Sequence, residues 1–162
     1  MSVRVGCPGC CRVRHGGLVR YYKQTALHVA AENGREAVAR QLLDRGADIE
    51  SNAADGQTVL HKAARSGNGA TARLLLDRGA NTMAQYAYNR TALHAAAEKG
   101  NNDIACMLLE RGADIQAKDV TGQTALRLAV VTGHEATAQL LLDRGADSEA
   151  ITQRQCSAAP QS

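Results

Sequence analysis

Three cysteines near the N-terminus form the one local group of residues typical of a metal or redox site. Cys7, Cys10 and Cys11 surround a Pro-Gly turn, and His15 follows four residues later. Two thiolates two residues apart can bind one zinc ion, but a structural zinc site needs four ligands and no second pair with this spacing follows. We therefore predict no bound metal and no cofactor. A small metal or redox knuckle stays open as the alternative to an unstructured leader.

Three histidines, His28, His61 and His94, recur 33 residues apart and form the pattern most easily mistaken for a catalytic or metal site. On successive packed helices these side chains would be separated by about 8–10 Å, so one metal ion could not bind all three. Arg127 replaces the histidine at the fourth position. A structural role in hydrogen bonding is the favoured interpretation.

Other candidate chemistry is equally weak. Residues 67–72 imitate the G-x-G-x-x-A dinucleotide fingerprint, but they join two expected helices instead of following a strand. Cys106 lies within an expected helix beside Ala105 and Met107, which favours a small buried thiol over a nucleophile. Acidic residues recur once per repeat, with no pair at catalytic spacing. We therefore predict that the chain is not an enzyme.

The elements that position these residues repeat every 33 residues. We call the residues that occupy the same position in successive repeats a column. The clearest column consists of threonines, each followed two residues later by a leucine. Its members are Thr25, Thr58, Thr91 and Thr124. Glycines, leucine pairs and Gly-Ala pairs keep the same period, as in Gly46-Ala47 and Gly79-Ala80. Four look-alike units in a row predict a stack of local contacts in place of one central core.

A 33-residue period with a Thr-x-Leu-His-x-Ala core resembles the ankyrin repeat, in which each unit contributes a turn and two helices. The resemblance implies an all-α solenoid, with a β-turn finger before each helix pair. We expect an unstructured leader at 1–19, a repeat domain at 20–150 and a disordered tail at 151–162. The expected repeats are about 20–52, 53–85, 86–118 and 119–150. Alanine or valine replaces the family's proline after the threonine.

Local signals predict the helix boundaries within the first repeat. Thr25 is a good helix N-cap, and Gly34 should end the first helix. The second helix is expected from about Glu36 to Arg45, and Gly46 should end it in the left-handed conformation. We expect the second helix to bury three apolar residues. They are Val38, Leu42 and Leu43.

In the last repeat, polar residues replace apolar ones at two columns, which predicts a softened outer face. They are Thr137 and Ser148. Terminal repeats of a solenoid need such a solvated face.

Composition and charge exclude several classes of protein. Aromatic residues make up only 2% of the chain, so leucine and alanine must supply the packing. The net charge of +3 hides an uneven distribution: residues 1–24 have five basic and no acidic residues, whereas residues 25–150 have 13 basic and 16 acidic ones. A nucleic-acid reader would show a basic stripe instead. No apolar run approaches the ~20 residues of a membrane span, and we expect a soluble cytoplasmic or nuclear protein.

The resemblance implies that fingers and first helices form a concave surface that binds another protein. The binding positions are those one, three, four and six residues before each threonine and seven and eight after it. All four tyrosines of the chain lie in finger segments, and tyrosine and arginine often dominate interface energy. Our candidate partner-binding residues, of which only Tyr86 lies beside these columns, are Tyr22, Asp55, Arg65, Tyr86, Tyr88, Arg90, Glu98, Lys99, Lys118 and Thr121.

The sequence thus favours a monomeric, non-catalytic protein-interaction module whose partner is unidentified. Two alternatives stay open. One is the metal or redox role of the cysteine leader, with the repeats as its support. The other is that the chain is a fragment of a larger signalling or effector protein whose activity lies elsewhere, because the first repeat would otherwise leave its outer face uncovered.

Overall fold

The computed structural model describes residues 24–148. In this range the chain forms four helix pairs separated by extended turns, with one short 3-10 helix in the second turn, between α4 and α5. The elements are α1 Ala26–Glu32, α2 Glu36–Asp44, α3 Val59–Ser66, α4 Gly69–Asp77, η1 Ala87–Asn89, α5 Ala92–Lys99, α6 Asn102–Glu110, α7 Ala125–Val131 and α8 Glu135–Asp143.

Threonine begins the first helix of every pair, as the sequence predicts. The Thr25 hydroxyl accepts a hydrogen bond from the backbone N–H of His28, and Thr124 caps α7 in the same way. Thr58 and Thr91 form capping boxes with the histidine three residues later. A left-handed glycine follows each first helix, and another follows each second helix. These caps explain why helices of only seven to nine residues have sharp ends.

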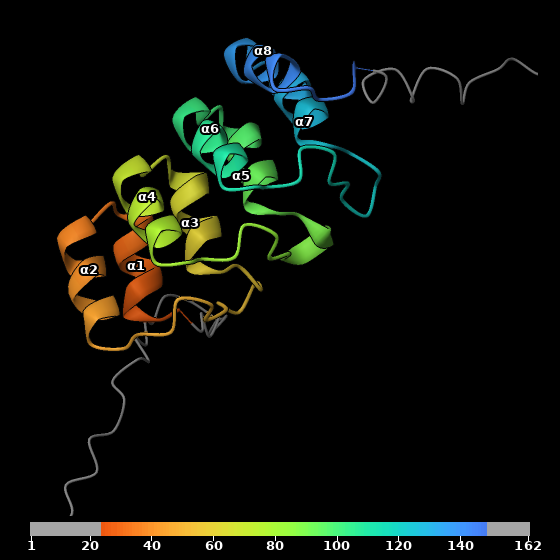
Figure 1. Cartoon of the computed structure of the whole chain (residues 1–162). Helices are drawn as coiled ribbons and strands as arrows, with labels where there is room; N and C mark the ends of the chain where they lie inside the picture. The colour runs from red at the N-terminus through yellow and green to blue at the C-terminus, as the bar shows by residue number, and fades with distance from the viewer. Residues whose placement is uncertain (1–23, 149–162) are drawn as a thin grey trace, which may run out of the picture.

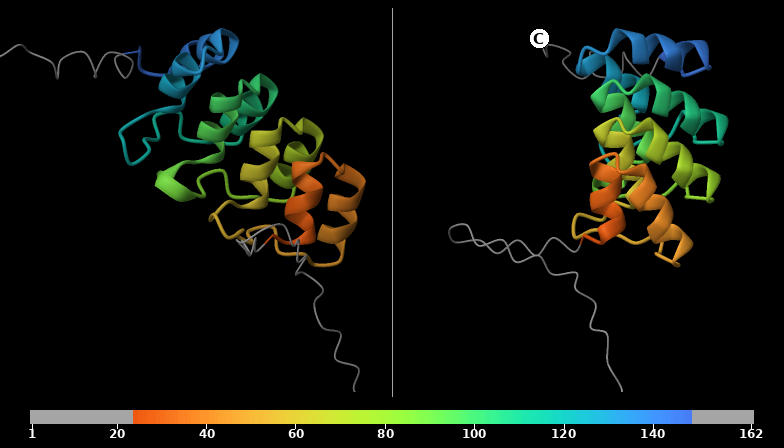
Figure 2. Two further views of the ribbon diagram at one scale, coloured as in Figure 1. Left: turned by 180° about the vertical axis from the view of Figure 1, so that it is seen from behind. Right: turned by 90° about the vertical axis from the view of Figure 1, so that its left-hand side faces the viewer.

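The helix pairs stack in chain order from α1 and α2 to α7 and α8 (Figure 1). First helices pack on first helices, α1 on α3, α3 on α5 and α5 on α7, and second helices pack in the same sequence. Figure 2 shows this stacked arrangement from two further sides. The core consists largely of buried leucines and alanines, for example Leu60, Leu93, Ala64 and Ala97. Small residues let the first helices approach closely, which is how a chain with so few aromatic residues buries a core.

The three extended turns project from one side of the stack (Figure 1) and form the fingers. We define them as residues 51–57, 84–90 and 117–123. The same backbone hydrogen bond closes each one, from Ala53 N to Gln57 O, from Tyr86 N to Arg90 O and from Asp119 N to Gln123 O, at 2.9 Å in all three. The fingers therefore repeat in geometry as well as in sequence.

Two packing predictions are wrong, and both concern the ends of the stack. Val38 is exposed, whereas Ala39 is the residue of α2 that lies fully buried. Thr137 is only 1% exposed, and its hydroxyl donates to the side-chain oxygen of Asn102 in the preceding repeat. The column that contains Val38 and Thr137 faces the preceding repeat, so it is buried in the last unit and uncovered in the first.

Several predictions fall beyond the described residues. The cysteine cluster at residues 7–11, the candidate Tyr22 and the boundaries at 19/20 and 150/151 all lie there. Within residues 24–148, no helix has both the length and the apolar character needed to cross a membrane. The same range has no cluster of three or more histidine, cysteine or acidic side chains that could hold a metal ion.

Candidate protein-binding surface

The repeated histidines are buried and belong to the frame, by which we mean the residues that hold the helix stack together. In His28, Nδ1 accepts a hydrogen bond from the backbone N–H of Thr25, and Nε2 donates to the carbonyl of Gln57 in the next repeat at 3.0 Å. His94 joins the carbonyl of Gln123 in the same way at 3.1 Å. Burial lowers the pKa of both imidazoles below the ordinary 6.5, which keeps them neutral. These two histidines therefore connect α1 and α5 to the fingers that follow them.

His61 departs from this pattern. Its Nδ1 accepts from the backbone N–H of Thr58 at 3.1 Å, but its buried Nε2 has no hydrogen-bond partner within the described part of the chain. The ring of Tyr86 packs edge-on against the imidazole, with 4.7 Å between ring centroids. Burial lowers the pKa of His61 to about 4. Tyr86 thus contacts the frame with its ring, in place of the finger aspartate that the fourth repeat has at the same position.

Arg90 connects the third and fourth repeats. Its Nη1 lies 3.0 Å from Oε2 of Glu98 on α5, and its Nε lies 3.3 Å from Oδ2 of Asp119 in the next finger. The carboxylate of Asp119 is almost fully buried. Burial alone would raise its pKa, but hydrogen bonds from Thr121, Gln123 and Arg90 lower it below the ordinary value. Arg90 therefore balances a buried charge, which limits what it can offer to a partner.

Tyr88 has the opposite character. Its side chain is 69% exposed, and its backbone has a φ of +66°. The next residue, Asn89, occupies the glycine position of the other fingers and is also left-handed, at +57°. A bulky residue at positive φ costs about 1–3 kcal/mol, and such strain is most often kept at functional sites. The second finger, residues 84–90, is thus strained at the position where it presents an aromatic ring to solvent.

Exposed apolar residues continue from Tyr88 onto the fourth repeat. The backbone N–H of Val120 donates to the carbonyl of Tyr88 at 2.9 Å, so the tips of the second and third fingers, residues 84–90 and 117–123, are directly joined. Val120 is 58% exposed, and Val131 at the end of α7 is 69% exposed. Val131 takes the column that is occupied by Arg65 on α3 and Glu98 on α5. We define the finger surface by these three residues together with the exposed Lys99, Lys118 and Thr121.

The other predicted site residues divide into exposed and bonded ones. Arg65, Lys99, Lys118 and Thr121 are exposed. The Asp55 carboxylate accepts from Gln57 and lies 3.4 Å from the nearly buried Nζ of Lys62, so Asp55 also stabilises its own finger. The partner columns contain Val120 and Val131, yet the emphasis on tyrosine and arginine left both out of the candidate residues. Their exposure at columns that are polar elsewhere is the signal that identifies them.

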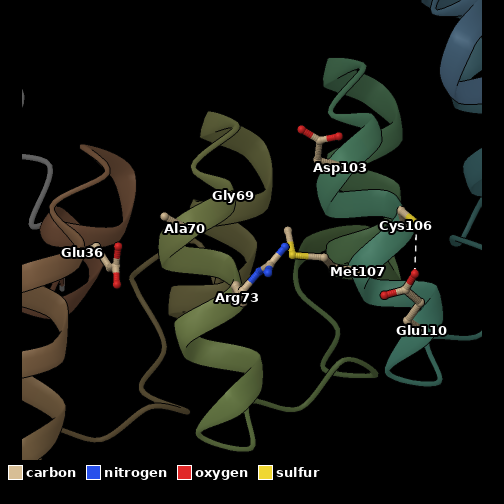
Figure 3. A pocket seen from close by; sticks show the side chains of 8 residues that line it. All are labelled: Glu36, Gly69, Ala70, Arg73, Asp103, Cys106, Met107 and Glu110. Atoms are coloured by element: carbon tan, nitrogen blue, oxygen red, sulfur yellow. Dashed lines mark hydrogen bonds between the residues drawn. The ribbon is translucent and has the colours of Figure 1, made fainter.

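A separate hollow of about 630 Å³ lies on the second helices, far from the fingers in the repeat unit. Its lining residues are Glu36, Gly69, Ala70, Arg73, Asp103, Cys106, Met107 and Glu110. Figure 3 shows Arg73 and Met107 projecting towards each other, while the half-buried Cys106 donates to Glu110 at 3.3 Å. None of the lining residues has a buried polar atom without a hydrogen bond. The hollow therefore has no buried polar group left free to bind a small ligand.

The stack of helix pairs and the projecting fingers define a helical repeat solenoid. A family model described as Ankyrin repeats (3 copies) matches residues 27–119 and again residues 86–152. The chain belongs to the ankyrin repeat family, whose members are generally protein-interaction modules and typically non-catalytic. A search of curated proteins found no relative that matches significantly.

Proposed function

We propose that the chain binds a protein partner through the finger surface, without catalysing a reaction. The observation that carries this proposal is Tyr88, a strained aromatic residue with 69% of its surface exposed at the tip of a rigidly bonded finger. Aromatic residues on a preorganised backbone lose little entropy on binding and often become the anchors of an interface.

The composition of the finger surface indicates the chemistry of the partner. Tyr88, Val120 and Val131 supply apolar area, and Lys99 and Lys118 place cations beside it. Arg90 and Glu98 neutralise each other through their ion pair, so they add little net charge. A segment that combines apolar and acidic side chains is the complementary partner.

Site-specific crosslinking tests this proposal. A photoreactive phenylalanine analogue at position 88 should crosslink a cellular protein, and the same analogue at Arg73 on α4 is the matched control. Both positions are exposed, but only the first lies on a finger. The protein identified in this way should then bind the purified chain in a calorimetric titration.

Removal of the Tyr88 ring should weaken that binding at least about tenfold, as for an interface anchor. Removal of the Arg73 side chain should leave the affinity unchanged. Equal crosslinking from both positions, or an affinity that depends on Arg73 and not on Tyr88, would assign binding to the second helices and refute the proposal.

A further inference from the structure

The first repeat has an uncovered apolar face. Val29 on α1 is 46% exposed and Val38 on α2 is 47% exposed. At the column of Val38 the later repeats have Thr71, Ile104 and Thr137, and none of these is more than 1% exposed. The difference arises because each later repeat has a preceding repeat packed on this face. Among the described residues, the first repeat has none.

The fourth repeat has the complementary uncovered face. Val130 on α7 is 44% exposed, whereas the alanines in its column, such as Ala64 and Ala97, are fully buried against the following repeat. Leu142 on α8 is 36% exposed, whereas Leu43, Leu76 and Leu109 in its column are buried or half-buried. The terminal face therefore exposes apolar side chains.

Inter-repeat ion pairs show that the two faces also match in charge. Arg78 lies 2.7 Å from Asp44 of the preceding repeat, Arg111 pairs with Asp77, and Arg144 lies 3.8 Å from Glu110. Each pair joins the arginine after a second helix to the acid that ends the previous second helix. Arg45 of the first repeat and Asp143 of the fourth repeat occupy the same two positions at the two ends of this series of ion pairs. A cation thus lies beside the first face and an anion beside the last.

A second set of inter-repeat hydrogen bonds follows the same rule. Asn68 and Asn101 each donate a side-chain N–H to the end of the preceding first helix, at 2.7 Å, and each packs against that helix's terminal glycine. Arg35 occupies the donor column in the first repeat. Gly133 is the glycine of the last repeat, and no atom of residues 24–148 lies within 4 Å of the position of a Cβ there. The last face therefore has space where the first face has a donor.

We propose that two copies of this chain associate head to tail, with the first repeat of one copy packed on the fourth repeat of the other. The contact continues the interface that already joins neighbouring repeats: Val29 and Val38 meet Val130 and Leu142, and Arg45 pairs with Asp143. This departs from the monomer that the sequence predicts. None of these residues belongs to the finger surface. Because the two faces differ, the contact is heterologous and can add further copies.

Sedimentation of the full chain tests this proposal. The average mass should rise with concentration past twice the 17.1 kDa of one chain, with no plateau at a dimer. Val38→Glu places a charge on the first face only, and Val130→Glu places one on the last face only. Each variant alone should therefore stay a monomer. Val120→Glu, a comparably exposed valine on a finger, should associate like the parent chain. Circular dichroism checks that each variant keeps its helices.

Mixing gives the decisive result. The Val38→Glu chain keeps an intact last face and the Val130→Glu chain an intact first face, so the two should form a 1:1 complex that grows no further. A parent chain that stays at 17.1 kDa at every concentration would overturn the proposal and assign the faces to other occupants, such as the terminal segments of the same chain or another protein. Variants that stay monomeric on mixing would also overturn it.

Discussion

At the scale of single residues, the buried histidines make stability depend on pH. His61 has a folded-state pKa of about 4, against an ordinary 6.5, because burial disfavours its charged form. The unfolded chain therefore binds more protons than the folded chain below pH 6.5. The contribution of His61 is complete above that pH and is lost as pH falls through the folded-state pKa.

We therefore predict that the free energy of unfolding decreases steadily from pH 6.5 to pH 4, which urea titration at several pH values can measure. His28 and His94, with lowered pKa values, contribute in the same direction. His61→Asn should lower stability at pH 7 and flatten the slope below pH 6.5. A parent chain with constant stability over this range would contradict the burial of the neutral imidazoles. Asp119, whose pKa is lowered, affects stability only below about its ordinary 3.8.

Arg90 and Tyr88 provide a second test at this scale, because they are two residues apart and have different surroundings. Arg90→Ala leaves the buried Asp119 carboxylate without its cation and should lower stability by about 1–3 kcal/mol. Tyr88→Gly relieves the strain at φ +66°, and the greater freedom of glycine in the unfolded chain partly offsets this gain. Its stability should change by less than about 1 kcal/mol.

Thermal melting of both variants checks this contrast. If Tyr88→Gly lowers the melting temperature as much as Arg90→Ala does, Tyr88 belongs to the frame and not to the binding surface.

The sequence predicts much of this residue-level structure, but only where a pattern repeats. The Thr-x-x-His spacing is enough to identify a capped helix start, and the period indicates a bond to the neighbouring repeat. The pairing of Arg90 with Asp119 spans 29 residues and occurs only once, so no column reveals it. The same holds for the positive φ of Tyr88, because tyrosine rarely adopts it.

At the scale of elements, the turns between paired helices hold neighbouring repeats together. A Cβ at Gly100 would lie 2.6 Å from Nδ1 of His134, whose Nε2 donates to the carbonyl of Glu98. Gly133 has a similar left-handed backbone, and within the described part of the chain no atom lies within 4 Å of the same position. A comparison of substitutions at the two glycines therefore separates the energetic cost of backbone strain from the cost of losing an inter-repeat contact.

Gly133→Ala should cost about 1 kcal/mol, from left-handed strain alone. Gly100→Ala should cost about 1 kcal/mol more, because it also displaces His134 from its hydrogen bond. Urea denaturation at low protein concentration measures both values. Equal losses in the two variants would mean that the contact between Gly100 and His134 contributes nothing to the stack.

At the scale of the whole molecule, periodicity makes the fold predictable and the ends difficult to predict. Inside the stack, the burial of a residue can be predicted from its column. The boundaries of the helix pairs follow from threonine and glycine. The environments of Val38 and Thr137 were predicted wrongly because both share a column with internal residues. The column alone does not tell which side of a repeat it faces.

The binding surface, too, is only partly predictable from the sequence. The fingers are predictable as a surface, since their residues vary while the frame repeats. Some finger-side residues already make ion pairs within the stack and are less available to a partner. Asp55, Arg90 and Glu98 are examples. Tyr88 and Val120 are left exposed on fingers that a backbone hydrogen bond joins.

Hydrogen exchange of the full chain with and without its crosslinked partner tests the central claim most directly. Binding through the finger surface predicts slower amide exchange in residues 84–90 and 117–123, with α2, α4 and α6 unchanged. Protection confined to α2, α4 and α6, with the fingers exchanging as fast as in the free chain, would contradict it.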